Sequence, residues 1–135
     1  ARTVAIARSL APARLFVVFG AGGNRDRAKR RPMGEAARPA DVVLLTTDNP
    51  RDEDPKDIAR TIAEGLVGHA GRRTILDREK AIWTAITEAS TDDVILIAGK
   101  GHETDQTIAG ETRHFSDVEV AREALTARAS SPAPA

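Results

Sequence analysis

The stretch 47–51, Thr-Asp-Asn-Pro-Arg, concentrates side chains that can do chemistry. Asp48 offers a carboxylate, Asn49 an amide and Arg51 a guanidinium fork, so the stretch combines hydrogen-bond donors with acceptors. Pro50 stiffens the turn that carries them, and a guanidinium can bind a carboxylate through two parallel hydrogen bonds. These residue types suit a zwitterionic ligand such as an amino acid.

A purely structural role explains the same stretch when it is considered alone. Asp48 and Asn49 can form an Asx turn before Pro50. Arg51 can pair with one of the acidic residues 52–54 that follow it. Taken alone, the stretch favours this structural interpretation. The other polar loops of the chain make a ligand-binding role more plausible.

A second polar loop, Gly99-Lys100-Gly101-His102-Glu103, follows another apolar run. It brings an amine, an imidazole and a carboxylate into one segment, and it lacks the spacing of a nucleotide-binding P-loop. A lone histidine such as His102 is more often a structural hydrogen-bonding group than a catalyst. No histidine pair has the spacing of a zinc site, so we expect no metal site in this chain.

A glycine-rich loop at 20–23 leads into Asn24 and Arg25. The glycines could cradle a pyrophosphate, although their spacing differs from G-x-G-x-x-G and a basic loop follows instead of a helix. They could also form only a tight turn before a solvated basic loop. In a third interpretation, that turn holds Arg25 in place as a ligand for an anion.

The elements that must position these loops alternate along the chain. Apolar runs predict strands, and helical periodicity with capping residues predicts helices. This alternation predicts an α/β, Rossmann-like fold: a mostly parallel sheet with helices on both faces and a C-terminal antiparallel hairpin. Carboxyl ends of parallel strands share one edge, so the three loops should meet there. The expected strands are 15–19, 42–46, 73–76 and 94–98, the last buried on both faces; the expected helices are 3–10, 32–37, 54–66, 77–89 and 116–127; the hairpin pairs 106–109 with 112–115.

Composition narrows the class of protein. The chain has 135 residues, and its 20 basic and 20 acidic side chains give a formal net charge of zero. This balance argues against nucleic acid and membrane partners, and the lack of cysteine excludes disulfides, thiolate zinc sites and a cysteine nucleophile. No apolar run reaches the length of a membrane span, so we expect a cytoplasmic protein. One domain is expected over 1–127, with a disordered tail over 128–135.

Three motifs occur in order at the ends of expected strands. They are Val-Phe-Gly-Ala-Gly-Gly-Asn-Arg-Asp at 18–26, Asp-Asn-Pro-Arg at 48–51 and Ala-Gly-Lys-Gly-His-Glu at 98–103. Together they resemble the C-terminal domain of the Mur ligases, and most closely that of the members that add diaminopimelate. The resemblance covers residues 3–126.

The resemblance implies a cytoplasmic, ATP-dependent amide-forming enzyme of peptidoglycan synthesis. In such ligases a central domain binds ATP and Mg²⁺ and phosphorylates the D-glutamate carboxylate of the UDP-MurNAc dipeptide. The amine of an amino acid, presented by the C-terminal domain, then attacks the acyl phosphate. Because the motifs of the central domain and of an upstream edge strand are absent from this sequence, we expect no cofactor, no catalytic residue and no ligation from this fragment alone.

The resemblance also implies that the domain binds meso-diaminopimelate, which differs from lysine by a carboxylate beside its distal ammonium. Arg51 and Arg25 can clamp that carboxylate, while Glu103 and Asn49 take the ammonium. Lysine would leave the arginines unpaired, which gives strong discrimination. The implied contacts are Arg25, Asp48, Asn49, Pro50, Arg51, Gly99 and Glu103, with Lys100 and His102 as accessory residues.

Departures from the family pattern concern the first loop. Asn24 stands where aspartate is common, Ala28 where glycine is usual, and Arg31-Pro32 replaces Pro-Leu. Two alternatives also remain for the function. One is a ligase that adds another diamino acid, although Arg51 argues against lysine. The other is a free-standing Rossmann-like nucleotide-binding or regulatory module, for which the glycine spacing fails.

Overall fold

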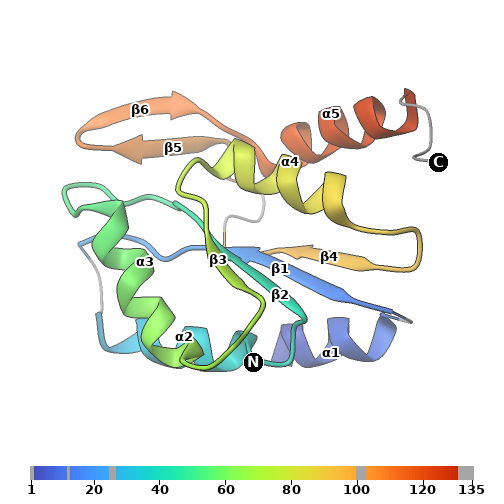
Figure 1. Ribbon diagram of the computed structural model, residues 1–135. Helices are drawn as coiled ribbons and strands as arrows, with labels where there is room; N and C mark the ends of the chain where they lie inside the picture. Colours follow the sequence, from blue (N-terminus) through green and yellow to red (C-terminus); the bar gives the residue numbers. More distant parts are fainter. Residues whose placement is uncertain (1, 12, 25–26, 100–102, 131–135) are drawn as a thin grey trace.

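The computed structural model describes residues 2–11, 13–24, 27–99 and 103–130 of the chain. The strand order of its central sheet is β3-β2-β1-β4, and every neighbouring pair is parallel (Figure 1). The loop after β1 is therefore flanked by the loops that follow β2 and β4. The four strands are β1 (Leu15–Phe19), β2 (Val42–Leu45), β3 (Arg72–Thr74) and β4 (Val94–Ile97).

Helices cover both faces of this sheet, so the predicted fold class is confirmed (Figure 1). The helices on one face are α1 (Arg2–Leu10), α2 (Arg30–Ala37) and α3 (Pro55–Ala63). Those on the other face are α4 (Arg78–Glu88) and α5 (Asp117–Ser130). Two 3₁₀ turns, η1 (Arg27–Lys29) and η2 (Glu64–Leu66), precede α2 and follow α3.

The C-terminal hairpin forms a separate two-stranded antiparallel sheet, as predicted. Its strands are β5 (Asp105–Ile108) and β6 (Glu111–His114). An isolated bridge joins Arg51 to Ile108. The hairpin is thereby attached to the loop that follows β2 rather than to an edge of the main sheet.

Alternating side chains of β1 supply the two cores. Leu15, Val17 and Phe19 pack in the cluster beneath α1, α2 and α3. Phe16 and Val18 pack in the cluster beneath α4 and α5. All five are buried, because helices cover both faces of a parallel sheet. Double-sided burial is the reason that this strand is a continuous apolar run.

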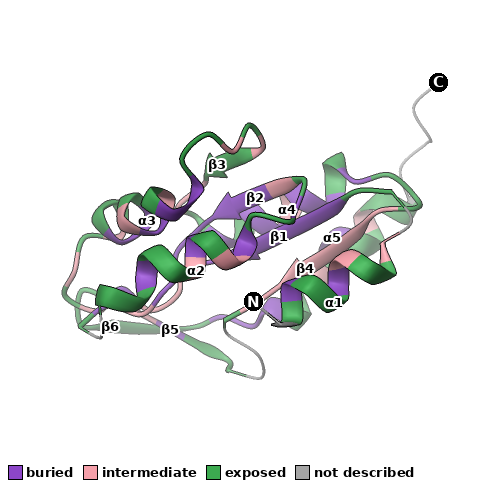
Figure 2. Cartoon of the chain, turned by 90° about the horizontal axis from the view of Figure 1, so that it is seen from below, coloured by how far each residue is buried: buried purple, intermediate pink, exposed green. Residues whose placement is uncertain are grey.

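β4 corrects an expectation, because it is an edge strand of the sheet and is not fully buried. All of its residues are half-buried, whereas β1 is buried along its whole length (Figure 2). A run of valine, isoleucine and leucine indicates that both faces are covered. It carries no information about the hydrogen-bonding edge, which is where an edge strand differs from a central one.

Helix starts follow the predicted capping residues in two cases. The side chain of Asp54 accepts a hydrogen bond from the Lys56 N–H at 2.9 Å, which caps α3. Asp77 accepts one from the Lys80 N–H at 3.2 Å, which caps α4. In contrast, α2 begins at Arg30 rather than at Pro32. Proline is tolerated in a first turn, where N–H groups have no partner within the helix.

The last helix differs from prediction at both ends. The Ser116 hydroxyl accepts a hydrogen bond from the Glu119 N–H at 3.3 Å, but the Glu119 carboxylate binds His114 at 2.7 Å instead of completing a capping box. α5 continues to Ser130, so the first residues of the predicted tail are helical, and 131–135 lie outside the described residues. None of the described helices is long and apolar enough to cross a membrane.

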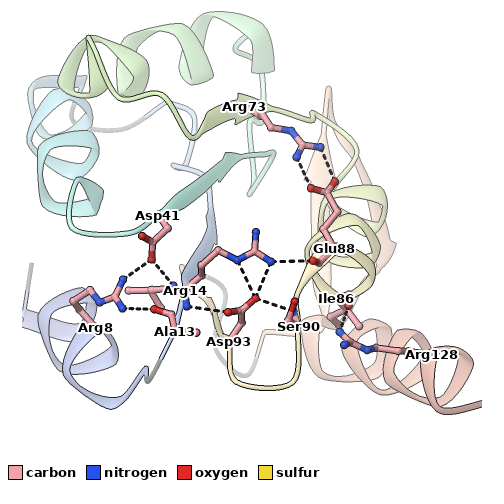
Figure 3. A network of polar contacts seen from close by, with 11 residues as sticks. Arg8, Ala13, Arg14, Asp41, Arg73, Ile86, Glu88, Ser90, Asp93 and Arg128 are labelled. Carbon is pink, nitrogen blue, oxygen red and sulfur yellow. Dashed lines mark hydrogen bonds and ion pairs between the residues drawn. The ribbon is translucent and has the colours of Figure 1, made fainter. Parts of the chain in front are cut away.

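Acidic side chains tie together the amino-terminal edge of the sheet (Figure 3). Asp93, just before β4, accepts hydrogen bonds from the Ser90 N–H at 2.7 Å and the Arg14 N–H at 2.8 Å. Asp41, just before β2, accepts one from the Leu15 N–H at 2.7 Å. The Ser90 and Leu15 donors lower the pKa values of Asp93 and Asp41, respectively. These contacts occupy the edge opposite the predicted site.

Candidate functional site

The loops after β1, β2 and β4 converge at the carboxyl edge of the sheet. A Cβ atom placed on Gly99 would lie 3.6 Å from Asp48 Oδ2 and 3.6 Å from Gly20 O, so one position contacts both other loops. Gly99 also has a φ of +100°, a conformation that favours glycine. Of the predicted site residues, Arg25, Lys100 and His102 lie outside the described residues.

The glycines of the first loop allow it to contact the second loop closely. A Cβ atom on Gly20 would lie 2.2 Å from Thr46 O, and one on Gly23 would lie 1.7 Å from Pro50 O. The Gly23 N–H donates a hydrogen bond to Asn49 O at 2.7 Å. Carbonyl oxygens that face these glycines would repel a phosphate. This geometry supports the tight-turn interpretation over a pyrophosphate cradle.

An ion pair between a buried arginine and a half-buried glutamate holds the first loop against the second. Arg30 is 1% exposed and donates hydrogen bonds to Glu53 Oε1 at 2.8 Å, Glu53 Oε2 at 3.0 Å and Gly22 O at 3.2 Å. The Asn24 N–H donates to Glu53 Oε1 at 2.7 Å. Sequence reasoning placed Arg30 in a solvated basic loop. Its helical spacing from Gly34 and Ala37, with which it shares the inner face of α2, was the signal that the sequence offered.

The pH dependence of stability should report this ion pair. Hydrogen bonds from Arg30 and from the Asn24 N–H lower the pKa of Glu53 from 4.5 to about 2. Because the pKa is lower in the folded chain, the stabilisation is complete above the unfolded value of 4.5 and is lost as the pH falls toward about 2.

In urea titrations, the free energy of unfolding should therefore fall less between about pH 6 and about pH 3 in Glu53→Gln than in the wild type. Glu111→Gln, at the exposed tip of the hairpin, is the control and should keep the wild-type pH dependence. An unchanged pH dependence in Glu53→Gln would contradict the assignment.

Asn49 is fixed by the hairpin and faces Glu103. Its Oδ1 accepts a hydrogen bond from the Thr107 N–H at 2.8 Å, and its Nδ2 donates one to Glu103 Oε2 at 3.4 Å. The side-chain oxygen therefore bonds across to the hairpin rather than forming the Asx turn of the structural interpretation. A pocket of about 370 Å³ opens here, lined by Asn49, Glu103, Thr104, Asp105 and Thr107.

Arg51 adopts a backbone conformation that is uncommon for a side chain with a Cβ atom. Its φ is +52°, which costs about 1–2 kcal/mol outside glycine. Residues held in such conformations cluster at active sites and ligand-binding turns. The hairpin maintains it: the Arg51 N–H donates to Thr107 O at 3.3 Å, and the Ala109 N–H donates to Arg51 O at 2.7 Å. Arg51 Nη1 donates to Gly23 O at 2.8 Å and to Asn49 O at 3.4 Å.

The acidic residues that follow Arg51 have other partners. Asp52 Oδ2 accepts a hydrogen bond from Asn24 Nδ2 at 3.1 Å, Glu53 binds Arg30, and Asp54 caps α3. The structural interpretation, in which Arg51 pairs with one of them, therefore receives no support. The guanidinium is half-buried between the first and second loops and is aimed by backbone carbonyls.

Gln106 is a supporting residue that sequence reasoning missed. It is 1% exposed, and its Nε2 donates to Asp48 O at 2.9 Å and to Thr47 O at 3.3 Å. Its Oε1 accepts hydrogen bonds from Arg113 Nη2 at 2.9 Å and Nε at 3.3 Å. A polar residue in a short hairpin strand gives no sign of burial, because the alternation of that strand is weak.

The described groups combine donors with an acceptor, but they do not all line the pocket. Asn49 Nδ2, a donor, and Glu103, an acceptor, belong to its lining. The Arg51 guanidinium, a second donor, is not part of the lining and bonds to Gly23 O and Asn49 O. Asn49 Oδ1 already accepts the Thr107 N–H, so the amide faces Glu103 with its donor end. Within the described ranges, no group of three His, Cys, Asp or Glu side chains could hold a metal ion.

The fold is a Rossmann-like α/β domain with three loops that converge at the carboxyl edge of its sheet, where such folds bind ligands. The chain belongs to the Mur ligase family, since the model of the "Mur ligase, glutamate ligase domain" family matches residues 1–101. Its relatives include two proteins named UDP-N-acetylmuramoyl-L-alanyl-D-glutamate–2,6-diaminopimelate ligase. The one from Chromobacterium violaceum is 54% identical over 116 residues, which cover 84% of this chain and 23% of the relative. The one from Geobacillus kaustophilus is 50% identical over 123 residues, 90% of this chain and 25% of the relative.

A solved structure of a protein with the same name shares the fold. It superimposes with a TM-score of 0.86 at 40% sequence identity, and the match covers 95% of this chain and 27% of that one. The predicted family is confirmed by these similarities. The chain spans about a quarter of the length of the relatives that it matches.

Proposed function

We propose that this chain is the amino-acid-binding domain of an ATP-dependent ligase that adds meso-diaminopimelate to UDP-MurNAc-L-Ala-D-Glu in peptidoglycan synthesis. The observation that carries the proposal is the turn at Arg51, whose strained backbone and guanidinium are both held by hydrogen bonds beside Asn49 and Glu103. The names of relatives that are about half identical to this chain support it.

Recognition of the ligand follows from the charges of these groups. In the proposed complex, Arg51 donates hydrogen bonds to the distal carboxylate of meso-diaminopimelate, and Glu103 accepts from the neighbouring ammonium. From the sequence, Asn49 is expected to take the ammonium as well, but its Oδ1 already accepts the Thr107 N–H, so its Nδ2 donates to the carboxylate instead. Arg25 adds a second cation to the carboxylate side. Asp48, Pro50 and Gly99 shape the wall between them. Lysine lacks the carboxylate, so its binding would leave Arg51 without its counter-charge.

ATP and Mg²⁺ belong, in this proposal, to the part of the ligase outside the chain. Gly20 and Gly23 contact carbonyl oxygens of the second loop, which is unsuitable for a phosphate. No step of ATP chemistry is therefore assigned to the described residues. The domain at 1–127 binds and orients the amino acid, and the reaction takes place in the cytoplasm, where nucleotide-activated precursors are made.

A titration with three ligands tests the proposal against a nucleotide-binding module. The ¹⁵N-labelled chain is titrated with meso-diaminopimelate, ATP and NAD, and amide chemical shifts are followed by NMR, which detects dissociation constants in the mM range. We expect binding of meso-diaminopimelate with saturable shifts. A saturable response to NAD or ATP alone would contradict the proposal and would favour the nucleotide-binding alternative.

A further inference from the structure

A buried arginine forms hydrogen bonds to both the second loop, which follows β2, and the third loop, which follows β4. Arg78, the first residue of α4, is 1% exposed. Its Nη1 donates to Thr47 O at 3.3 Å, and its Nη2 donates to Ala98 O at 3.1 Å. Thr47 directly precedes Asp48, and Ala98 directly precedes Gly99. One guanidinium thus holds the start of both loops.

The same guanidinium is oriented by a carboxylate on another helix. Arg78 Nε donates to Asp117 Oδ1 at 2.7 Å, and Nη2 donates to Asp117 Oδ2 at 2.6 Å. Asp117 is the first residue of α5 and is itself buried. This bidentate pair fixes the plane of the fork. The remaining donor directions then point at the carbonyls of the two loops.

Stability alone is a poor reason for this arrangement. Removing two charges from water is costly, and apolar residues of similar volume often stabilise a protein as well as a buried ion pair does. A planar fork, in contrast, has donors at fixed separations that an apolar side chain lacks. What Arg78 adds is a fixed distance between Thr47 O and Ala98 O.

We propose that Arg78 is a positioning residue for the amino-acid site. By holding Thr47 O and Ala98 O, it sets the separation between the second loop, which carries Asn49 and Arg51, and Gly99 at the start of the third loop. A ligand that contacts both loops can be bound only at the correct separation. This inference rests on the proposed function, because it assigns Arg78 a role in binding the same ligand.

A double variant separates positioning from stability. Arg78→Met/Asp117→Leu replaces the buried pair with apolar side chains, so its melting temperature should stay close to that of the wild type. Its dissociation constant for meso-diaminopimelate, measured by NMR titration, should rise by about 10- to 100-fold because the loops lose their common anchor. The amides of Asp48 and Gly99 should also shift in the absence of ligand.

A conservative variant keeps the test decisive if the double variant is unstable. Arg78→Lys retains a cation beside Asp117 but lacks the fork, so it should fold and still bind meso-diaminopimelate more weakly. The matched control is Arg73→Gln/Glu88→Gln, which removes another bidentate pair, with contacts of 2.8 and 2.9 Å, near the opposite edge of the sheet (Figure 3). The control should bind with the wild-type dissociation constant.

Two outcomes would overturn the inference, and they differ in what else they overturn. If folded Arg78→Lys or the folded double variant binds meso-diaminopimelate as the wild type does, Arg78 is only a structural residue and the proposed function stands. If the wild-type chain shows no saturable response to meso-diaminopimelate, the proposed function fails and the inference fails with it.

Discussion

Replacing Arg51 is expected to abolish the preference for meso-diaminopimelate over lysine. The guanidinium donates hydrogen bonds to the carbonyl oxygens of Gly23 and Asn49, which hold it beside Asn49. A charged hydrogen bond contributes about 1.5–3 kcal/mol, so the ratio of the two dissociation constants should fall by about 10- to 100-fold in Arg51→Ala. Competition titrations with the two amino acids measure this ratio.

A second substitution at the same position isolates the side chain from the backbone. Arg51→Gly also removes the guanidinium, but glycine adopts a φ of +52° without strain. Both variants should therefore lose the preference, while the exposed Arg60→Ala on α3 should retain it. If Arg51→Gly retained the wild-type preference, the guanidinium would not be the selector.

Substitution of Gly23 with alanine should damage the fold and the site together. The added Cβ would lie 1.7 Å from Pro50 O, a backbone atom that cannot move without displacing the turn. We expect the free energy of unfolding in urea to fall by about 3 kcal/mol, at the upper end of overpacking effects. Affinity for meso-diaminopimelate should fall as well, because Asn49 O accepts the Gly23 N–H.

The matched control for this prediction is Gly68→Ala. Gly68 has a φ of +81°, but a Cβ there would meet no heavy atom within 4 Å. Its cost should be limited to about 1–2 kcal/mol for the left-handed conformation. Equal losses in the two variants would show that the close approach of Gly23 to Pro50 is not important for stability.

The sequence predicts the fold well because its signals are local. β1 and β2 are runs of apolar side chains, and Asp54 and Asp77 cap helices through neighbouring N–H groups. Because strands and helices alternate, the strands run parallel, and the loops that follow them lie at the same edge of the sheet. The predicted helix ends were less accurate, as at α2 and α5, and the edge position of β4 was missed because it depends on what pairs with the strand and not on its own residues.

For the candidate site, the sequence predicts the residue types and the edge of the sheet at which they lie, but not the contacts that hold them. The sequence places Asn49, Arg51 and Glu103 on loops that share an edge, and Asn49 indeed contacts Glu103. It could not supply the groups that hold them, since Arg78 and Gln106 reach Thr47 O from positions far along the chain. Such contacts arise from tertiary packing and have no local pattern.

The sequence also could not predict the structural roles of Gly20, Gly23 and Gly99. The spacing of Gly20 and Gly23 fits a phosphate-binding pattern only loosely, and the sequence alone leaves that role open beside a tight turn. Carbonyl oxygens beside both positions decide between the two interpretations. Gly99, in turn, is favoured by its positive φ alone, because a Cβ atom there would meet Asp48 only at an ordinary contact distance of 3.6 Å.

The most direct test of the account is the location of meso-diaminopimelate on the wild-type chain. In the NMR titration, saturable shifts should concentrate at the amides of Asn49, Arg51, Gly99 and Glu103, and lysine at the same concentration should leave these amides nearly unchanged. Shifts that concentrate elsewhere on the chain, or equal shifts with lysine, would contradict the claim that these loops form a selective diaminopimelate site.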